Sequence, residues 1–247
     1  MRVLYDPQIF AQQRIGGVSR VFAELYAHYR EGDYDVVPLV PPWIGDNVHA
    51  RAAGLPQTSL AKQHRLPARV RLQAAIARTT TKRLSLRHWR FDLFHPTYYD
   101  PYFLSLLDGQ PFVVTIHDLI HELFADTYYR NHEELRSARR RIVHQACRII
   151  AVSQTTKSDL VRLLDVDPEK IDVVYNGYAA ETLEGADSAL LRGITQPYLL
   201  FVGKRGTYKN FDTLARAVAL NRRSGYDTPV LCIGGGRFTD SENRVLT

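Results

Sequence analysis

The stretch that decides the fold is PFVVTIHDLIHE, residues 111–122, together with RIIAVSQTTKSDLVRLL, residues 148–164. Each stretch opens with a short, continuous apolar run and then turns polar, and the second continues with apolar residues at helical spacing. Continuous apolar runs of this length are typical of parallel strands that are covered on both faces. Strand and helix patterns that alternate in this way predict a doubly wound α/β fold.

The same alternation continues on both sides of these stretches. Further strands are expected at Arg2–Tyr5, Asp35–Val40, Phe91–His95, Ile171–Val174, Tyr198–Val202 and Val230–Ile233. Helices are expected at Val18–Tyr29, Asn131–Gln145, Ser153–Leu164 and Lys209–Arg223. Pro38 indicates a strand that lies at an edge or ends early. Asn131 with Glu134 resembles a capping box, and Ser153 is a typical N-cap.

This pattern divides the chain into two domains. Residues 1–178 read as a Rossmann-like domain, residues 179–196 as a linker, and residues 197–247 as a partial second domain. The second domain has two predicted strands and one predicted helix, which leaves most of its sheet face bare. We therefore expect the second Rossmann-like domain to be incomplete in this chain.

The composition excludes several classes of protein. Of 247 residues, 45% are hydrophobic and 23% are charged, which is typical of a folded chain and not of a disordered one. No apolar run reaches the roughly 18 residues of a membrane-spanning helix, and the N-terminal sequence does not resemble a secretory signal. Cys147 and Cys232 each lie in an apolar run and are expected to be buried thiols in a reducing compartment, so we expect a cytoplasmic protein.

The net charge of +6 is concentrated in one segment. Between Asn47 and Phe91 the chain has ten basic residues and no acidic one. The residues 62–90 can form an ordinary solvated helix, or a basic amphipathic face for peripheral contact with an anionic membrane or a lipid-linked phosphate. No recognised nucleic-acid module accompanies this charge, so nucleic acid is not the expected partner.

Two groups of residues in the first domain are candidates for chemistry. His117 and Asp118 follow a predicted strand, and ligands of doubly wound sheets bind at the carboxyl ends of strands. Gly16 and Gly17 precede a predicted helix, where glycine lets a ligand approach the backbone and the helix N-terminus favours an anion. The structural alternatives are that Asp118 caps a short turn, that His117 is a satisfied core histidine, and that the glycines serve the turn alone.

A third candidate group lies in the second domain. Lys204, Arg205 and Lys209 follow the strand Tyr198–Val202 and precede a helix. Cations beside a helix N-terminus predict a diphosphate site, and a solvated basic loop is the alternative. The D-x-D triplets at residues 33–35 and 165–167 read as turns, so a metal site is not expected.

Six stretches occur together in a recognisable order: GGVSRVFAEL, VVTIHDLIHE, IIAVSQTTKSDL, VVYNGY, FVGKRGTYKNFDTL and GGGRF. In this order they resemble the retaining glycosyltransferases of family four, the group 1 transferases with the GT-B fold. Within that family they are most similar to bacterial mannosyltransferases of O-antigen and exopolysaccharide assembly. The resemblance implies two Rossmann-like domains and metal-independent transfer of a hexose, mannose being favoured, from a GDP- or UDP-linked donor to a glycan or lipid-linked acceptor.

The resemblance also implies roles for single residues. Gly16 and Gly17 match a glycine pair near the donor phosphate and the acceptor, and His117 matches a histidine that hydrogen-bonds the donor sugar. Lys209 and either Lys204 or Arg205 match a basic pair that binds the diphosphate. The family's glutamate pair in an EGFGLP-like stretch does not occur in this chain. The alternative function is therefore an inactive, truncated remnant or a module that binds the acceptor or a membrane.

Overall fold

The computed structural model describes residues 1–58, 86, 89–178, 196–206, 208–226, 228–240 and 242–243. The chain forms two compact units, Met1–Ala125 with Tyr129–Gly177 and Asp126–Tyr128 with Tyr178–Thr247. The predicted linker lies outside the described residues except at Gln196. The predicted basic segment 62–90 also lies outside them, except at Leu86, Trp89 and Arg90.

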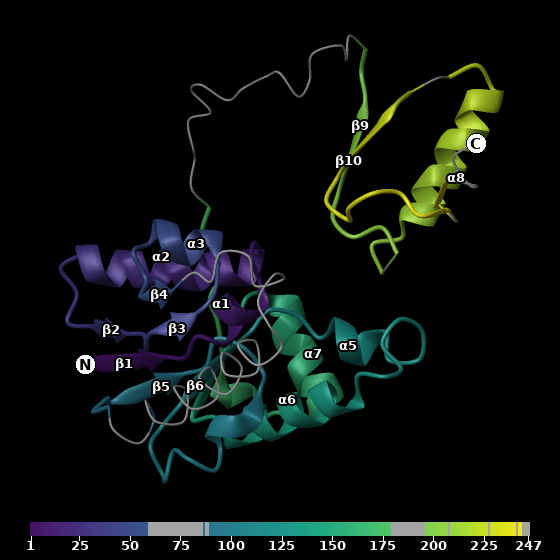
Figure 1. The fold of residues 1–247 in the computed structure, drawn as a ribbon. Coiled ribbons are helices and arrows are strands. Elements are labelled where there is room, and N and C mark those ends of the chain that lie inside the picture. Colours follow the sequence, from purple (N-terminus) through teal and green to yellow (C-terminus); the bar gives the residue numbers. More distant parts are fainter. Residues whose placement is uncertain are drawn as a thin grey trace, which may run out of the picture. The chain divides into compact units, whose positions relative to one another are not determined.

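The first unit is built on parallel strands (Figure 1). They are β1 (Arg2–Tyr5), β2 (Val37–Leu39), β5 (Leu93–His95), β6 (Val113–Ile116), β7 (Arg148–Ala151) and β8 (Ile171–Val173). They form two sheets of order β2-β1-β5 and β6-β7-β8, and an isolated parallel bridge between Phe94 and Phe112 joins β5 to β6. The strand β2, which contains Pro38, is an edge strand as predicted.

Helices and a small second ladder complete this unit. The helices are α1 (Gln8–Gln12), α2 (Gly17–Glu31), α3 (Val48–Ala52), α5 (Ile120–Leu123), α6 (Glu133–Gln145) and α7 (Gln154–Leu164). Short 3-10 turns lie at η2 (Pro101–Phe103) and η3 (Pro168–Lys170). The parallel pair β3 (Trp43–Ile44) and β4 (Gln57–Thr58) was not predicted, because two-residue strands leave no periodic pattern.

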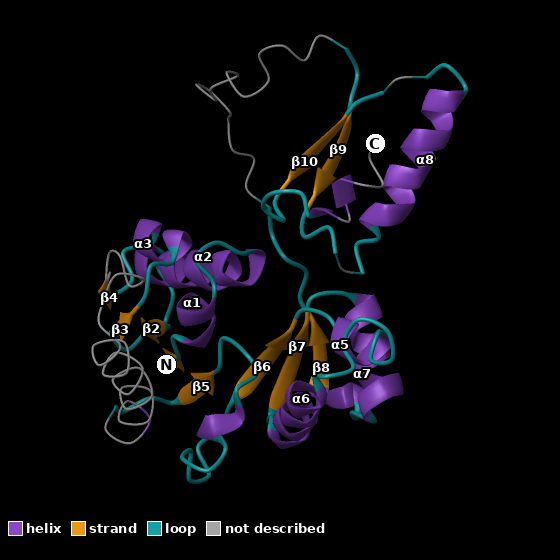
Figure 2. Ribbon diagram, turned by 45° about the vertical axis from the view of Figure 1, so that its right-hand side comes forward, coloured by secondary structure: helices purple, strands orange, loops and turns teal. Residues whose placement is uncertain are grey.

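The sheet is covered on both faces, as the continuous apolar runs predicted. Side chains alternate across a strand, so neighbours in β1 enter different clusters. Leu4 belongs to the larger apolar cluster, with Phe94, Val114 and Ile149, whereas Val3 and Tyr5 belong to the cluster beneath α2. Figure 2 shows β6, β7 and β8 side by side, with α6 and α7 beside them.

Of the two predicted helix N-caps, one is confirmed and the other is wrong. Ser153 caps α7, and its hydroxyl accepts the amide N–H of Thr156 at 3.1 Å. Asn131 does not cap α6, which begins at Glu133 after an N-cap at His132. The reason is a turn closed by the N–H of His132 on the carbonyl of Tyr129, which takes Asn131 out of the capping position.

The prediction that both cysteines are buried was wrong. Cys147 is exposed and Cys232 is half-buried. The strand β7 begins one residue later, at Arg148, so Cys147 lies in the turn that precedes it. Its thiol donates to the carbonyl oxygen of Phe112 at 3.0 Å.

The second unit contains β9 (Leu199–Val202), α8 (Phe211–Arg223) and β10 (Val230–Ile233), within a residue or two of the predicted bounds. The two strands pair in parallel, and Val202 lies opposite Ile233. Phe201 packs edge-on against Phe211 of α8, with ring centroids 5.0 Å apart. Within the described parts of both units, none of the helices combines the length and the apolar character that crossing a bilayer requires.

Candidate functional site

The strand order of the first unit creates a switch point. The chain leaves β1, pairs β2 on one side of it, and later pairs β5 on the other side. Crevices at such switch points, beyond the carboxyl ends of the strands, are where doubly wound sheets bind ligands. Gly16 and Gly17 begin α2, which follows β1 and the short helix α1, and His117 and Asp118 follow β6, so the sheet brings these predicted residues to the same edge.

His117 has one polar atom without a partner. Its Nε2 atom is buried and makes no hydrogen bond within the described part of the chain. Burial lowers the pKa of His117, a shift that Asp118 opposes and Arg139 reinforces, so the ring is neutral at neutral pH. A buried polar atom without a hydrogen bond is costly, which marks Nε2 as a position where a ligand can supply the missing partner.

The surroundings of His117 are aromatic and apolar. The ring of Phe22, on α2, meets it edge-on with centroids 6.3 Å apart. Phe22 also packs edge-on against His95 at 5.3 Å, and the Nε2 atom of His95 lies 2.9 Å from the hydroxyl of Thr115. Complete burial, with help from His117, lowers the pKa of His95 to about 3. Both histidines are therefore uncharged, and both pack against Phe22 in surroundings that are shielded from water.

Asp118 lies differently from His117. Its side chain is exposed, and its Oδ1 atom accepts the amide N–H of Ile120 at 3.3 Å. This contact agrees with the structural alternative, a carboxylate that caps a short turn. A direct catalytic role for Asp118 stays a prediction.

The glycine pair begins a long helix. Gly16 is the N-cap of α2, and no side chain caps this helix. The space that a Cβ atom of Gly16 would fill is taken by the side-chain amide of Gln13, whereas Gly17 faces open space. An uncapped helix N-terminus next to open space suits an anion, and a phosphate contact at this glycine pair stays a prediction.

A residue that sequence reasoning missed fixes this glycine loop. Asn47 is fully buried, and its side-chain N–H group donates to the carbonyl oxygen of Gln13 at 2.7 Å. Its side-chain oxygen accepts the N–H of Ala50, and its backbone is paired with the amide of Gln57. The polar groups of Asn47 are thus satisfied, and the loop before Gly16 is anchored to α3.

Asp6 is a second residue that sequence reasoning missed. It follows β1, is 2% exposed, and accepts hydrogen bonds from the side chains of Gln8, Thr97 and Tyr102 at 2.6–3.0 Å. These contacts tie the end of β1 to the loop after β5. The contacts with Thr97 and Tyr102 span more than 90 positions in sequence, so a lone Asp after a strand gave no sign of them.

Arg205, in the second unit, is buried and surrounded by its own chain. Its guanidinium donates to Glu242 at 2.8 Å and to the carbonyl oxygens of Gly234, Gly235, Gly236 and Arg237 at 2.9–3.4 Å. It also lies over the ring of Phe238, 4.2 Å from the centroid. A diphosphate contact by Arg205 stays a prediction that requires some of these bonds to be exchanged for phosphate oxygens.

One of the two predicted lysines lines an open cavity in this unit, and the other lies on the same loop. Lys204 lines the cavity, which measures about 720 Å³. The side chain of Lys209 crosses Gly203, and its ammonium group donates to the carbonyl oxygen of Val202 at 3.3 Å. Gly203 has a φ angle of +131°, and a Cβ atom there would lie 2.7 Å from the Lys209 side chain, so glycine is required. The remaining lining residues of the cavity are Arg205, Gly206, Asp212, Gly235, Gly236, Thr239 and Glu242.

The family model for Glycosyltransferase Family 4 matches residues 15–182. The chain belongs to this family. The match begins just before the glycine pair and includes His117, Asp118 and Asn176–Gly177, so the family predicted from the sequence is confirmed. A search of the curated proteins found no match.

Solved structures confirm the fold. A glycosyltransferase from Rickettsia africae is 16% identical with a TM-score of 0.51, and the lipopolysaccharide outer core galactosyltransferase WaaB is 14% identical with a TM-score of 0.51. The alignments cover 99% and 100% of this chain, and 63% and 70% of those chains. The α/β fold of the GT-B type predicted from the sequence is therefore confirmed, and this chain spans about two thirds of the length of these structures.

The same fold also occurs outside the glycosyltransferases. A Listeria monocytogenes structure described as a UDP-N-acetylglucosamine 2-epimerase is 10% identical with a TM-score of 0.52, and the match covers 99% of this chain and 65% of that one. Since one fold hosts several reactions, the reaction has to be argued from the site and the family.

Proposed function

We propose that this protein transfers a hexose, with mannose favoured, from a GDP- or UDP-linked donor to a glycan or lipid-linked acceptor. The single observation that carries the proposal is the buried, unpartnered Nε2 atom of a neutral His117 at the switch-point edge. A hydroxyl of the donor sugar is a suitable partner for this atom, because a neutral imidazole nitrogen forms one hydrogen bond with a hydroxyl. Membership of Glycosyltransferase Family 4 supports the same reaction class.

The proposed reaction retains the configuration at the anomeric carbon. The bond from the anomeric carbon to the donor phosphate oxygen breaks, and the acceptor oxygen bonds to the same face of that carbon. The acceptor proton passes to the departing phosphate oxygen, which yields a nucleoside diphosphate. Negative charge develops on the leaving group, so we assign Lys204, Arg205 and Lys209 to the diphosphate and the N-terminus of α2 to a phosphate as well.

The first test is transfer from GDP-mannose, UDP-galactose and UDP-glucose to a polyprenyl-diphosphate-linked sugar. We expect His117→Ala to lower kcat/KM by roughly 100-fold or more, since it removes a contact to the reacting sugar. His28→Ala, which changes an exposed histidine at the far end of α2, is the matched control. Turnover by His117→Ala at the wild-type rate would overturn the assignment.

The lysine assignment has its own pair of variants. Lys209→Ala should weaken binding of GDP or UDP in calorimetry, whereas Arg216→Ala, an exposed cation on α8, should not. Activity that persists in EDTA and an anomeric proton coupling that matches the donor would support the metal-independent, retaining mechanism.

The membrane contact proposed for residues 62–90 is tested separately. Sedimentation with vesicles that contain phosphatidylglycerol should bind the protein at low salt and release it at high salt. Binding of vesicles or acceptor without any transfer would favour the alternative of a binding module. Vesicles of phosphatidylcholine alone are the control, and equal binding to both would contradict an electrostatic contact with the inner, anionic face of a membrane.

A further inference from the structure

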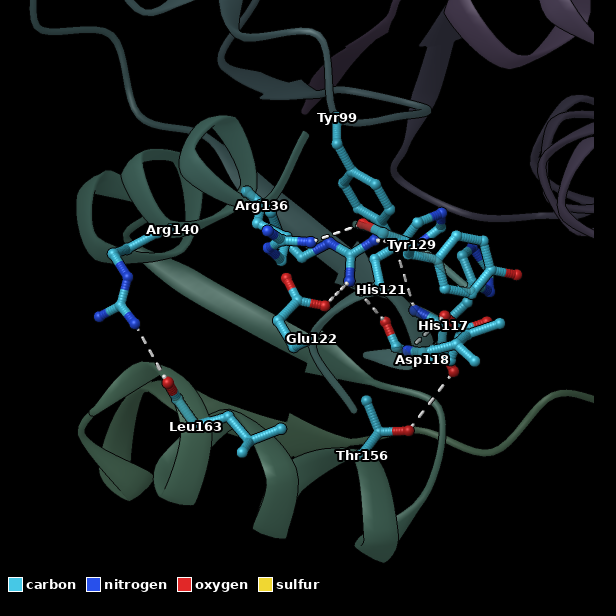
Figure 3. A network of polar contacts seen from close by, with 12 residues as sticks. Tyr99, His117, Asp118, His121, Glu122, Tyr129, Arg136, Arg140, Thr156 and Leu163 are labelled. Atoms are coloured by element: carbon cyan, nitrogen blue, oxygen red, sulfur yellow. Dashed lines mark hydrogen bonds and ion pairs between the residues drawn. The ribbon is translucent and has the colours of Figure 1, made fainter. Parts of the chain in front are cut away.

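The turn at His117–Asp118 is held by side chains instead of by backbone pairing (Figure 3). The hydroxyl of Tyr99 accepts the backbone N–H of His117 at 3.3 Å and donates to the carbonyl oxygen of Thr115 at 3.4 Å. The hydroxyl of Thr156 donates to the carbonyl of His117 at 3.4 Å, and Arg139 donates to the carbonyl of Asp118 at 3.1 Å. Three separate parts of the chain therefore fix the backbone of this turn.

Tyr99 is suited to this double contact. It is 4% exposed, and burial raises its pKa to about 12, so its hydroxyl keeps its proton across the physiological range. One hydroxyl can then accept from His117 and donate to Thr115 at the same time. The Tyr99 hydroxyl thus forms hydrogen bonds with two backbone groups at the end of strand β6.

Arg139 contacts both the Tyr99 ring and the His117–Asp118 turn. It is 1% exposed, its guanidinium carbon lies 4.5 Å from the centroid of the Tyr99 ring, and it donates to Glu122 at 2.6 Å. Buried ion pairs of this kind rarely improve stability over apolar residues of similar volume, because both charges lose their hydration. Stability alone therefore does not account for an arginine here, whereas its contact with the Asp118 carbonyl gives it a positional effect.

We propose that Tyr99 and Arg139 are positioning residues that fix the backbone of the His117–Asp118 turn, so that the unpartnered Nε2 atom of His117 is held ready for the donor sugar. This inference rests on the proposed function for its last step. Neither residue touches the ligand: Tyr99 acts through the N–H of His117, and Arg139 through the Asp118 carbonyl and the Tyr99 ring.

The sharpest test compares Tyr99→Phe with Tyr102→Phe. Each change removes one hydroxyl from a tyrosine that lies largely within the same unit's interior, and the hydroxyl of Tyr102 binds Asp6 at 3.0 Å instead of the turn. Tyr99→Phe should speed hydrogen exchange at the His117 amide and shift its imidazole resonances, assigned by comparison with His117→Gln. It should also lower kcat/KM by about 2- to 12-fold, the range expected for one net hydrogen bond.

Two outcomes of this comparison would overturn the inference. One is a His117 amide and imidazole in Tyr99→Phe that match the wild type. The other is a Tyr102→Phe variant that moves these signals as much as Tyr99→Phe at an equal loss of Tm, since the effect would then be a general loss of packing.

Arg139 is tested with a paired variant, because Arg139→Met alone leaves Glu122 buried and unpaired. The double variant Arg139→Met, Glu122→Leu removes both charges, so no buried charge is left unpaired and the protein can still fold. Hydrogen exchange at the His117 amide should be faster in this variant, because the Asp118 carbonyl and the Tyr99 ring have lost their contact with the guanidinium. Arg140→Met, on the exposed side of the same helix, is the control, and a His117 amide that exchanges at the wild-type rate in the double variant would overturn the role of Arg139.

The nuclear magnetic resonance readouts separate this inference from the proposed function. If the wild-type protein neither binds nor uses any sugar nucleotide, the proposed function fails. In that case the His117 amide and imidazole still decide whether Tyr99 and Arg139 position the turn.

Discussion

Among the residues that the structure describes, each unit has one buried arginine, and the two have the same kind of surroundings. Arg139 pairs with Glu122 at 2.6 Å and lies 4.5 Å from the Tyr99 ring, while Arg205 pairs with Glu242 at 2.8 Å and lies 4.2 Å from the Phe238 ring. Both guanidinium groups donate to backbone carbonyls in a loop that follows the carboxyl end of a strand, β6 in one unit and β10 in the other.

The two arginines differ in the number of loop carbonyls to which each guanidinium donates. Arg139 reaches one carbonyl, and its Nε atom and the Glu122 Oε1 atom have no partner among the described residues. Arg205 reaches four carbonyls and uses its Nε atom for Glu242. Burial raises the pKa of Glu122 against the pull of Arg139, whereas hydrogen bonds from Arg205 and Thr239 lower the pKa of Glu242 to about 2.

A buried cation can thus hold the backbone of a loop in place. The turn after β6 is also held by the hydroxyls of Tyr99 and Thr156, so Arg139 contributes a single carbonyl contact there. The loop after β10 contains Gly234, Gly235 and Gly236, which have the greatest backbone freedom and need several contacts to be ordered. An arginine near a strand end therefore need not be a ligand for phosphate.

The two buried arginines should differ in how much their replacement destabilises the protein. Arg139→Met should lower the local free energy of unfolding by about 3–5 kcal/mol, because it leaves a buried carboxylate without its partner. Arg205→Met should cost less, since the Glu242 carboxylate still accepts the N–H of Thr239 at 2.7 Å. Native-state hydrogen exchange reads both units in one sample. Equal losses of free energy in the two variants would contradict this difference between the arginines. The control Arg140→Met should stay within about 0.5 kcal/mol of wild type.

Acid should affect the two units in different ranges of pH. The folded pKa of His95 is about 3 and its ordinary value is 6.5, so the unfolded chain binds a proton in this window that the folded chain does not. Stability of the first unit should therefore fall as the pH drops below 6.5, by about 1.4 kcal/mol per pH unit and thus by about 2 kcal/mol at pH 5. The contribution of Glu242 should be complete above its ordinary value of 4.5 and lost as the pH falls toward 2.

The measurement for this prediction is the urea midpoint of each unit, followed by resolved amide resonances between pH 7 and pH 4. His95→Gln should make the profile of the first unit less steep between pH 6.5 and 4. Part of the slope should remain, because burial also lowers the pKa of His117 and lowers that of His121 to about 4. Glu242→Gln should leave that profile unchanged, and a wild-type slope in His95→Gln would show that His95 does not contribute.

A pair of glycines tests how closely Arg205 holds its loop. Gly235 and Gly236 have φ angles of +76° and +70°, so alanine at either position should cost about 1–2 kcal/mol in backbone strain. A Cβ atom at Gly235 would also lie 3.0 Å from the Arg205 guanidinium, whereas Gly236 has open space. We expect Gly235→Ala to lower the Tm more than Gly236→Ala, and equal shifts would mean that the loop tolerates displacement of Arg205.

The smallest expected effect concerns the two thiols. Cys147 is exposed, while burial raises the pKa of the half-buried Cys232. Cys147 should react faster with a disulfide reagent at pH 8, because access and thiolate fraction both set the rate. Cys147→Ser should change stability by less than about 0.5 kcal/mol and abolish the fast phase, and a fast phase that survives would place it at Cys232.

The parallel α/β fold, the family and the position of His117 at a strand end could all be predicted from the amino-acid sequence. Apolar runs, the glycines before α2 and the cap at Ser153 are local features, and local features follow from neighbouring residues. The α6 cap and the burial of Cys147 were predicted wrongly, because a turn at Tyr129–His132 and the starting residue of β7 are set by the packing of the whole unit.

The polar groups that hold the site could be found only in the folded structure. Tyr99 and Arg139 reach the His117–Asp118 turn from 18 and 21 positions away, and Arg205 reaches its glycine loop from 29 to 32 positions away. The sequence shows that Arg205 is a cation near a strand end, but it does not show that chain carbonyls and Glu242 surround it. The physical reason is that a hydrogen bond between distant residues depends on how the elements pack, and no periodicity along the chain encodes that distance.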